Sequence, residues 1–376
     1  MRARLRKGLT MRCTPAAFLF SIAFLAACAP RPPELRIAAM PPAILLPTAK
    51  AGITDGRGRF REIYCAVRAD HGAELPFDRP CDTSAALWQL PGEPPPSSGQ
   101  LVALGPSSAG LTVVMVPGLL AECLMSESTV FGDARADLEA QGYQTGYIQT
   151  RGRQASEINA GIIRDAIRAM PAEARIILVT HSKGTVDSLL ALATYPDLAD
   201  KVVALVSVAG AVNGSPLADI VPDWVAQMAE AIALPECPRG HGVEAADSLR
   251  RSERLTWLAT HAWPASVRTY SLVAVAGPND MSAVLRPFAD ILSRTEPAND
   301  GLVVASDAII PGSTLLGYAH ADHLAIAMPF GANAPLLGAT LMTHNDYPRA
   351  VLLEAAIRFV QEDLRLAPPP VSGGGG

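Results

Sequence analysis

A serine lies between a buried apolar run and a helical pattern. Residues 175–180 are apolar enough to form a buried strand, Ser182 follows, and apolar residues after Gly184 recur at helical spacing. A sharp turn from strand to helix exposes a serine hydroxyl and directs the first N–H groups of the helix at a developing oxyanion, as acyl transfer requires. Ser182 is therefore the predicted nucleophile. Thr180 stands where the G-x-S-x-G motif has its first glycine, so its neighbours must leave room for a β-carbon.

A serine nucleophile needs a general base and a carboxylate that orients the base. Asp300, in a turn over residues 298–303, and His323, in the segment 317–324, are the predicted acid and base. The order Ser, Asp, His fits loops that open at the carboxyl edge of a parallel sheet. Two alternatives remain: His320 as the base, and Asp280, which follows a strand run, as the acid.

The oxyanion needs two N–H donors, and two backbone positions are candidates. Lys183 opens the helix after the serine, and Leu119 follows the turn Pro117–Gly118 at the end of a predicted strand. Loss of one such donor costs about 3 kcal/mol of transition-state stabilisation. Two further polar residues are expected to have structural roles. Asp322 is predicted to be a turn or cap residue, and His181 is predicted to pack beside the serine turn without useful titration.

Strands and helices alternate from residue 111 onward. Apolar or β-branched runs predict strands at 111–116, 144–149, 175–180, 202–208 and 270–276, with helical patterns between them. This alternation predicts a parallel sheet covered by helices on both faces. Some sixty residues separate the fourth run from the fifth, which predicts a cap at about 211–268. A helical stripe at 221–232 is interpreted as a docked helix, with a mobile lid as the alternative.

The motifs resemble the α/β-hydrolase superfamily, and specifically secreted bacterial triacylglycerol lipases and esterases, over residues 111–330. The Asn-Asp-Gly-Leu-Val turn at Asp300 and the His-Leu pair at His323 carry the resemblance. It implies an α/β-hydrolase fold with a mostly parallel central sheet, helices on both faces and a cap insertion. By the same resemblance Ser182 is the nucleophile, with Leu119 and Lys183 lining the oxyanion hole.

The chain departs from that family's pattern at three positions. Ala325 stands where the lipases have a calcium-binding aspartate, so no metal is predicted, and no cofactor is expected either. Pro117 replaces a histidine and Thr180 replaces a glycine, which leaves the substrate class less defined than the fold.

The N-terminus has the pattern of a bacterial lipoprotein signal peptide. Residues 1–27 carry five basic and no acidic side chains and end in an apolar run, followed by Cys28 after small residues. Cys28 is the predicted lipidation site, and a Pro-rich tether follows it. In such lipoproteins Ala29 after the cysteine implies the outer membrane, so the predicted location is the bacterial cell envelope.

The net charge and the cysteine content limit which binding partners and which cellular compartment the sequence predicts. Removing the five basic residues of the leader leaves 26 basic against 36 acidic side chains, a net charge of −10, so no nucleic-acid partner is expected. Four cysteines beyond residue 28 suit disulfides in an exported protein. Of the three possible pairings we favour Cys65–Cys81 with Cys123–Cys237. The first would close a surface loop and stabilise the fold by about 3 kcal/mol.

The predicted organisation is a signal peptide at 1–27, a tether and N-terminal extension at 28–110, a hydrolase domain at 111–362 and a disordered tail at 363–376. Residues 34–110 are expected to be irregular and wrapped on the core. The predicted function is an exported, lipid-anchored serine hydrolase that cleaves carboxylic esters, with an ester or acyl-lipid substrate. Two alternatives are an inactive binding lipoprotein of the same fold and an acyltransferase that uses the same triad.

Overall fold

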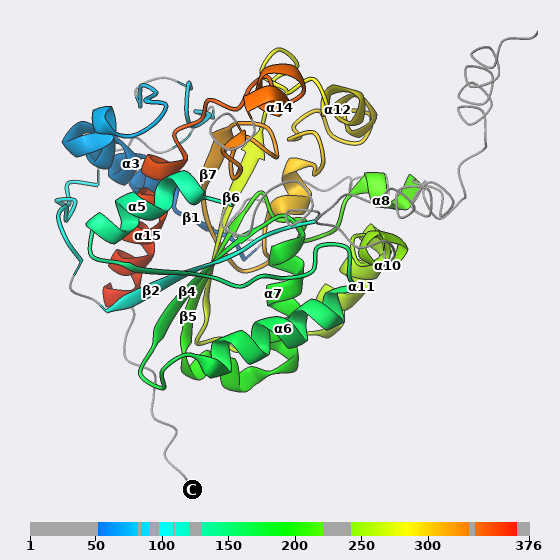
Figure 1. Cartoon of the computed structure of the whole chain (residues 1–376), viewed down its shortest axis with the longest axis horizontal. Helices are drawn as coiled ribbons and strands as arrows, with labels where there is room; N and C mark the ends of the chain where they lie inside the picture. The colour runs from blue at the N-terminus through cyan, green and yellow to red at the C-terminus, as the bar shows by residue number, and fades with distance from the viewer. Residues whose placement is uncertain are drawn as a thin grey trace, which may run out of the picture. The chain divides into compact units, whose positions relative to one another are not determined.

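Within the described residues of the computed structural model, seven strands form one parallel sheet (Figure 1). The structure describes residues 52–81, 84–90, 93, 98–107, 110–119, 130–220, 242–330 and 335–366. The strand order is β1-β7-β6-β5-β4-β2-β3. The strands are β1 (Thr54–Asp55), β2 (Leu111–Val116), β3 (Gln144–Tyr147), β4 (Arg175–His181), β5 (Val202–Val208), β6 (Arg268–Val275) and β7 (Thr314–His320).

Helices cover both faces of this sheet. One face carries α3 (Arg57–His71), α5 (Gly132–Ala140) and α15 (Arg349–Leu366), which pack against one another (Figure 1). The other carries α6 (Ser156–Ala169), α7 (Lys183–Thr194) and η3 (Pro196–Asp200). The remaining helices are η2 (Gly72–Glu74), α8 (Pro216–Ile220), α10 (Gly242–Asp247), α11 (Arg251–Thr260), α12 (Arg286–Leu292), η4 (Ala305–Ala308) and α14 (Pro335–Thr340).

Alternating side chains on the central strands separate the two cores. On β2, Val113 and Met115 join the cluster under α3, α5 and α15, whereas Val114 and Val116 join the cluster under α6 and α7. Both faces of each central strand are buried, as in parallel sheets with helices on both sides. The continuous apolar runs in the sequence therefore reflect burial on two faces, and the predicted fold class is confirmed.

All five predicted strands are present, with ends that differ by up to two residues: the second ends at Tyr147, the third continues to His181, and the fifth spans Arg268–Val275. Strands β1 and β7 were not predicted. β1 has only two residues, and Gly317 interrupts the apolar pattern of β7. β7 pairs with β6, and β1 pairs with β7 at the edge of the sheet. β7 ends at His320, so it leads directly into the segment with His323.

The irregular course predicted for residues 34–110 is wrong at Arg57–His71, which forms the fifteen-residue helix α3. Phe60, Ile63, Tyr64 and Val67 have helical spacing and are buried in the core. The segment after α3 is joined to β7 through an antiparallel bridge between Leu87 and Ala319. The extension therefore completes the core of one face of the sheet.

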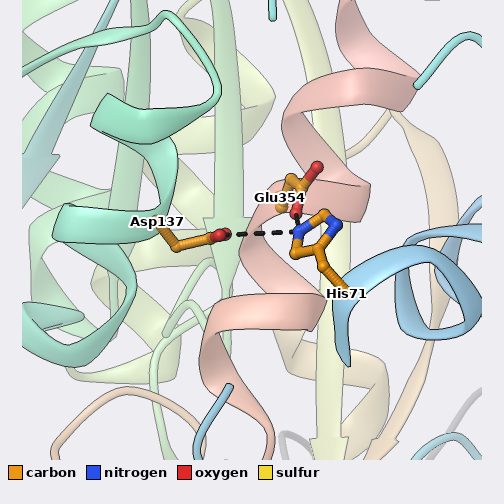
Figure 2. Close-up of side chains that lie close together, drawn as sticks. All are labelled: His71, Asp137 and Glu354. Carbon is orange, nitrogen blue, oxygen red and sulfur yellow. Dashed lines mark hydrogen bonds and ion pairs between the residues drawn. The ribbon is translucent and has the colours of Figure 1, made fainter. Parts of the chain in front are cut away.

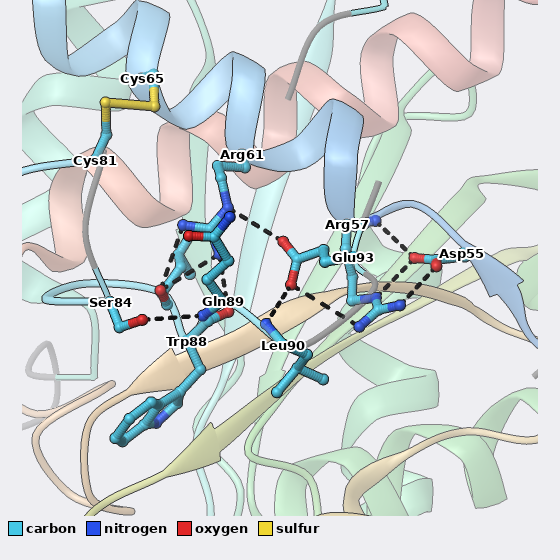
Figure 3. A network of polar contacts seen from close by, with 11 residues as sticks. Asp55, Arg57, Arg61, Cys65, Cys81, Ser84, Trp88, Gln89, Leu90 and Glu93 are labelled. Carbon is cyan, nitrogen blue, oxygen red and sulfur yellow. Dashed lines mark hydrogen bonds and ion pairs between the residues drawn. A yellow bond between two sulfur atoms is a disulfide. The ribbon is translucent and has the colours of Figure 1, made fainter. Parts of the chain in front are cut away.

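A network of polar contacts joins α3 to the loop that follows it (Figure 3). The Arg61 guanidinium donates to the carbonyl oxygens of Leu87 and Trp88 and to the Glu93 carboxylate. The indole N–H of Trp88 donates to the Val275 carbonyl oxygen at 2.8 Å. These bonds connect the N-terminal segment to the end of β6.

Cys65 and Cys81 form the predicted disulfide, with their Cα atoms 5.4 Å apart (Figure 3). It links α3 to the loop after it and closes a loop with a sequence separation of 16. The second predicted pair, Cys123–Cys237, lies outside the described residues.

Several other predictions concern residues outside the described part of the chain: the signal peptide, Cys28 with its tether, and the helical stripe at 221–232. Helix α15 continues to Leu366, so the tail predicted from residue 363 is wrong at its first residues. No helix among the described residues has both the length and the hydropathy that a membrane span requires.

Candidate active site

Ser182 occupies a strained turn between β4 and α7. Its backbone has φ 53° and ψ −125°, a region that residues with a side chain rarely adopt. The Ser182 carbonyl oxygen accepts the N–H groups of Thr185 and Ala211, which hold the strained residue in place. This is the geometry that turns a serine hydroxyl away from its own backbone.

Glycines allow the strand ends to approach this turn closely. A Cβ at Gly118 would lie 2.6 Å from the Cβ of Ser182, and a Cβ at Gly184 would lie 2.7 Å from the carbonyl oxygen of Val116. The turn after β2 therefore packs directly against the nucleophile turn, and neither glycine has room for a side chain.

Thr180 fits its buried position through hydrogen bonds. Its hydroxyl pairs with the Thr185 hydroxyl at 2.8 Å and donates to the Val206 carbonyl oxygen at 3.3 Å. Gly210 leaves the necessary space, since a Cβ there would lie 2.7 Å from the Thr185 hydroxyl oxygen. The neighbours of Thr180 thus leave room for its β-carbon, as this departure from the motif requires.

Asp300 is buried in a turn between α12 and η4, and backbone groups fix its carboxylate. Oδ1 accepts the N–H groups of Leu302 at 2.9 Å and Val303 at 2.7 Å, which leaves Oδ2 facing His323. Gly301 has φ +96°, and a Cβ there would lie 2.8 Å from Leu285 and Met281 side-chain atoms. The turn therefore requires glycine after the aspartate.

His323 connects Asp300 to Ser182. Its Nδ1 lies 2.7 Å from Asp300 Oδ2, and its Nε2 lies 2.8 Å from Ser182 Oγ. All three residues are at most 7% exposed. Ser182 directly follows β4, His323 follows β7, and Asp300 lies in the turn between α12 and η4. The predicted nucleophile, base and acid thus form one hydrogen-bonded chain.

His181 packs under this chain. Its ring centroid lies 4.8 Å from that of His323, and its Nε2–H donates to the His323 carbonyl oxygen at 2.9 Å. Burial, reinforced by the adjacent His323 ring, lowers the pKa of His181 to about 3, so the ring is neutral at pH 7. His181 positions the backbone of the base, a role that the sequence did not reveal.

The two alternatives from the sequence, His320 and Asp280, pair with each other. His320 Nε2 lies 3.0 Å from Asp280 Oδ2, its Nδ1 lies 2.7 Å from the Ser84 carbonyl oxygen, and its ring packs against Trp88. Both nitrogens of His320 therefore have partners other than the nucleophile. Neither residue belongs to the hydrogen-bonded chain that contains Ser182.

Asp322 has the turn role expected for it. Its carboxylate accepts N–H groups from Ser282, Leu324 and Ala325, at 2.8 to 3.0 Å. These bonds fix the turn in which His323 lies.

The two predicted oxyanion donors lie at the ends of elements that meet at Ser182. Lys183 is the first residue of α7, where N–H groups have no partner within the helix. Leu119 follows Gly118, whose backbone adjoins Ser182. The turn after β2 and the first residue of α7 thus both adjoin Ser182.

The side chain of Lys183 has a separate structural role that was not predicted from the sequence. Its ammonium is fully buried and lies 2.8 Å from Asp187, which also accepts a hydrogen bond from Asn159 on α6. The i, i+4 spacing of Lys183 and Asp187 was the available signal. The ion pair anchors the start of α7 against α6.

Comparison with known proteins gives one strong match. The solved structure of a metagenomic carboxyl esterase is 54% identical to this chain, and the match covers 89% of this chain and all of that one with a TM-score of 0.83. Mature Bacillus licheniformis lipase BlEst2 is 22% identical (60% of this chain, 89% of that chain, TM-score 0.46). Aspergillus fumigatus lipase B is 16% identical (58% and 46%, TM-score 0.32). No protein-family model and no curated protein matches the chain.

Proposed function

Because the chain belongs to the carboxyl esterases of the α/β-hydrolase fold, we propose that it cleaves carboxylic esters through an acyl-enzyme on Ser182. His323 acts as general base and Asp300 orients it. The hydrogen-bonded chain from Ser182 Oγ through His323 to Asp300 carries this proposal, with contacts of 2.8 and 2.7 Å. The carboxylate fixes the tautomer with the proton on Nδ1, which leaves the Nε2 lone pair facing the hydroxyl.

In the first half-reaction the Ser182 hydroxyl transfers its proton to His323 Nε2 while Oγ bonds to the ester carbonyl carbon. The π electrons of the carbonyl move to its oxygen, which becomes the oxyanion. When the tetrahedral intermediate collapses, the alkoxide leaves with the proton from His323, and the acyl group stays on Ser182.

In the second half-reaction His323 removes a proton from water, and the hydroxide attacks the acyl carbon. Collapse of this second intermediate releases the carboxylic acid and returns the proton to Ser182 Oγ. The N–H groups of Lys183 and Leu119 stabilise both oxyanions, and the close approach of Gly118 to Ser182 supports this assignment.

The test compares hydrolysis of short-chain and long-chain p-nitrophenyl esters by the wild-type protein with that by Ser182→Ala and His323→Ala. Both variants should lose activity, whereas His320→Ala, the matched control, should retain it. Equal activity in wild type and Ser182→Ala would refute the nucleophile assignment, and loss only in His320→Ala would assign the base to the alternative histidine.

We also propose that the enzyme is exported and anchored by a lipid on Cys28, where it acts on acyl-lipids or other hydrophobic esters. The lipobox-like sequence at the end of the leader supports this. Growth of the expressing bacterium with an alkynyl fatty acid should label the wild-type chain and leave Cys28→Ala unlabelled. Equal labelling of the two chains, or none of either, would exclude the anchor.

A further inference from the structure

Three potential metal ligands converge on the face of the sheet covered by α3, α5 and α15 (Figure 2). His71 is the last residue of α3, Asp137 lies on α5 and Glu354 lies on α15. Each contributes one ligand atom, and these atoms lie within 4.8 Å of one another. The cluster belongs to none of the groups assigned to ester cleavage.

The ligand atoms have spacings close to those of a zinc site. His71 Nε2 lies 2.7 Å from Glu354 Oε2 and 3.5 Å from Asp137 Oδ1. Zinc bonds to nitrogen and carboxylate oxygen are about 2.0–2.1 Å long, so tetrahedral ligands lie about 3.3 Å apart. A cation between these atoms requires only small movements of side chains.

One carboxylate in the cluster lacks a full set of partners. Asp137 is 9% exposed, and its Oδ2 has no hydrogen-bond partner. An unpartnered buried oxygen beside a second carboxylate is a costly arrangement that a bound cation relieves.

Surrounding groups orient the ligand atoms. Asp70 Oδ2 lies 3.0 Å from His71 Nδ1, so the imidazole donates there and presents Nε2 to the cluster. Arg358 donates to Glu354 Oε1 and leaves Oε2 facing His71. A carboxylate behind a ligating histidine is the usual support in zinc sites. The His71 side chain is 14% exposed, which gives an ion a route from solvent.

We propose that His71, Asp137 and Glu354 bind one zinc ion with a water molecule as the fourth ligand, and that this site ties α3, α5 and α15 together. One imidazole and two carboxylates favour zinc over calcium or magnesium, which prefer oxygen ligands alone. None of the three ligands belongs to the triad. We therefore expect the ion to raise the free energy of unfolding and to leave the chemical step unchanged.

The test is calorimetric titration of the chelator-treated full-length protein with zinc chloride, with calcium chloride as the comparison. The wild type should bind one zinc per chain, and zinc should raise its Tm. His71→Gln and Asp137→Asn should bind zinc at least about tenfold more weakly. His261→Gln, which changes an exposed histidine on α11's C-terminal side, should bind zinc like the wild type.

Asp137→Asn keeps the size of the side chain while it removes the charge and replaces one carboxylate oxygen with an amide NH₂. Melting curves without zinc verify that each variant is folded. Absence of zinc binding to the wild type would overturn the proposal. Equal zinc affinity in the wild type and in folded His71→Gln and Asp137→Asn would overturn it too, as would calcium binding at the same strength.

Discussion

Replacement of Asp300 by asparagine should reverse the tautomer of the catalytic histidine. The Leu302 and Val303 N–H groups both donate to Oδ1, so they will hold the amide oxygen of an asparagine at that position. The amide NH₂ then takes the place of Oδ2, 2.7 Å from His323 Nδ1. A donor there forces Nδ1 to accept, which places the imidazole proton on Nε2, where it can no longer accept the Ser182 proton.

The loss should be large and confined to the chemical step. In a triad, reversal of the tautomer lowers kcat by about 10⁴-fold, which corresponds to about 5.4 kcal/mol of transition-state free energy. Because the two backbone donors keep an acceptor, we expect little change in the free energy of unfolding. Steady-state hydrolysis of a short-chain p-nitrophenyl ester gives kcat and KM, and denaturant unfolding gives stability.

The matched control is Asp280→Asn, which alters the carboxylate paired with His320. It should keep kcat near the wild-type value. The reasoning is refuted if Asp300→Asn keeps more than about a tenth of wild-type kcat while folded, since that loss is far below the expected magnitude. A large loss in Asp280→Asn alone would move the acid to the alternative position.

Three further outcomes follow from the packing around the site. Gly118→Ala places a Cβ 2.6 Å from that of the nucleophile, so we expect about 1–3 kcal/mol of destabilisation and a marked fall in kcat/KM; wild-type kinetics would contradict the assigned close approach. Asp187→Ala leaves a buried ammonium without its partner and should lower the free energy of unfolding by about 3–5 kcal/mol, measured with denaturant; a loss below about 1 kcal/mol would show that the ion pair is dispensable. The pKa of His181 is lowered to about 3, below its unfolded value of 6.5, so its burial costs no stability above pH 6.5 and destabilises the fold as the pH falls towards 3. The wild type should therefore lose about 2 kcal/mol from this group between pH 6.5 and 5, and His181→Asn should not; equal pH slopes would contradict this.

Much of the fold was predictable because its signals are local. Four of the five predicted strands, β2, β4, β5 and β6, are buried on both faces, and burial of that kind requires continuous apolar runs that are visible without any partner. The edge elements were missed for the converse reason. β1 is two residues long and is held by β7, and α3 lies in a segment whose surrounding prolines and glycines indicated irregular structure.

The site was partly predictable for the same reason. The turns that hold Ser182 and Asp300 depend on neighbouring residues, including Gly184 and Gly301, and so leave motifs in the sequence. The leucine after His323 favoured it over His320, but that local signal does not show which ring faces Ser182. Only three residues separate them, and the path of the chain after β7 directs one ring to Ser182 and the other to Asp280.

The sequence by itself determined five of the seven described strands, the turn that holds Ser182 and the order of the proposed catalytic residues, because each depends on contacts within a short segment. Only the tertiary structure decided which histidine faces the serine, how Thr180 is accommodated, and that His71, Asp137 and Glu354 meet. Three helices packed on one face of the sheet bring these last three residues together. Residues that meet only through packing of distant helices leave no local motif in the sequence.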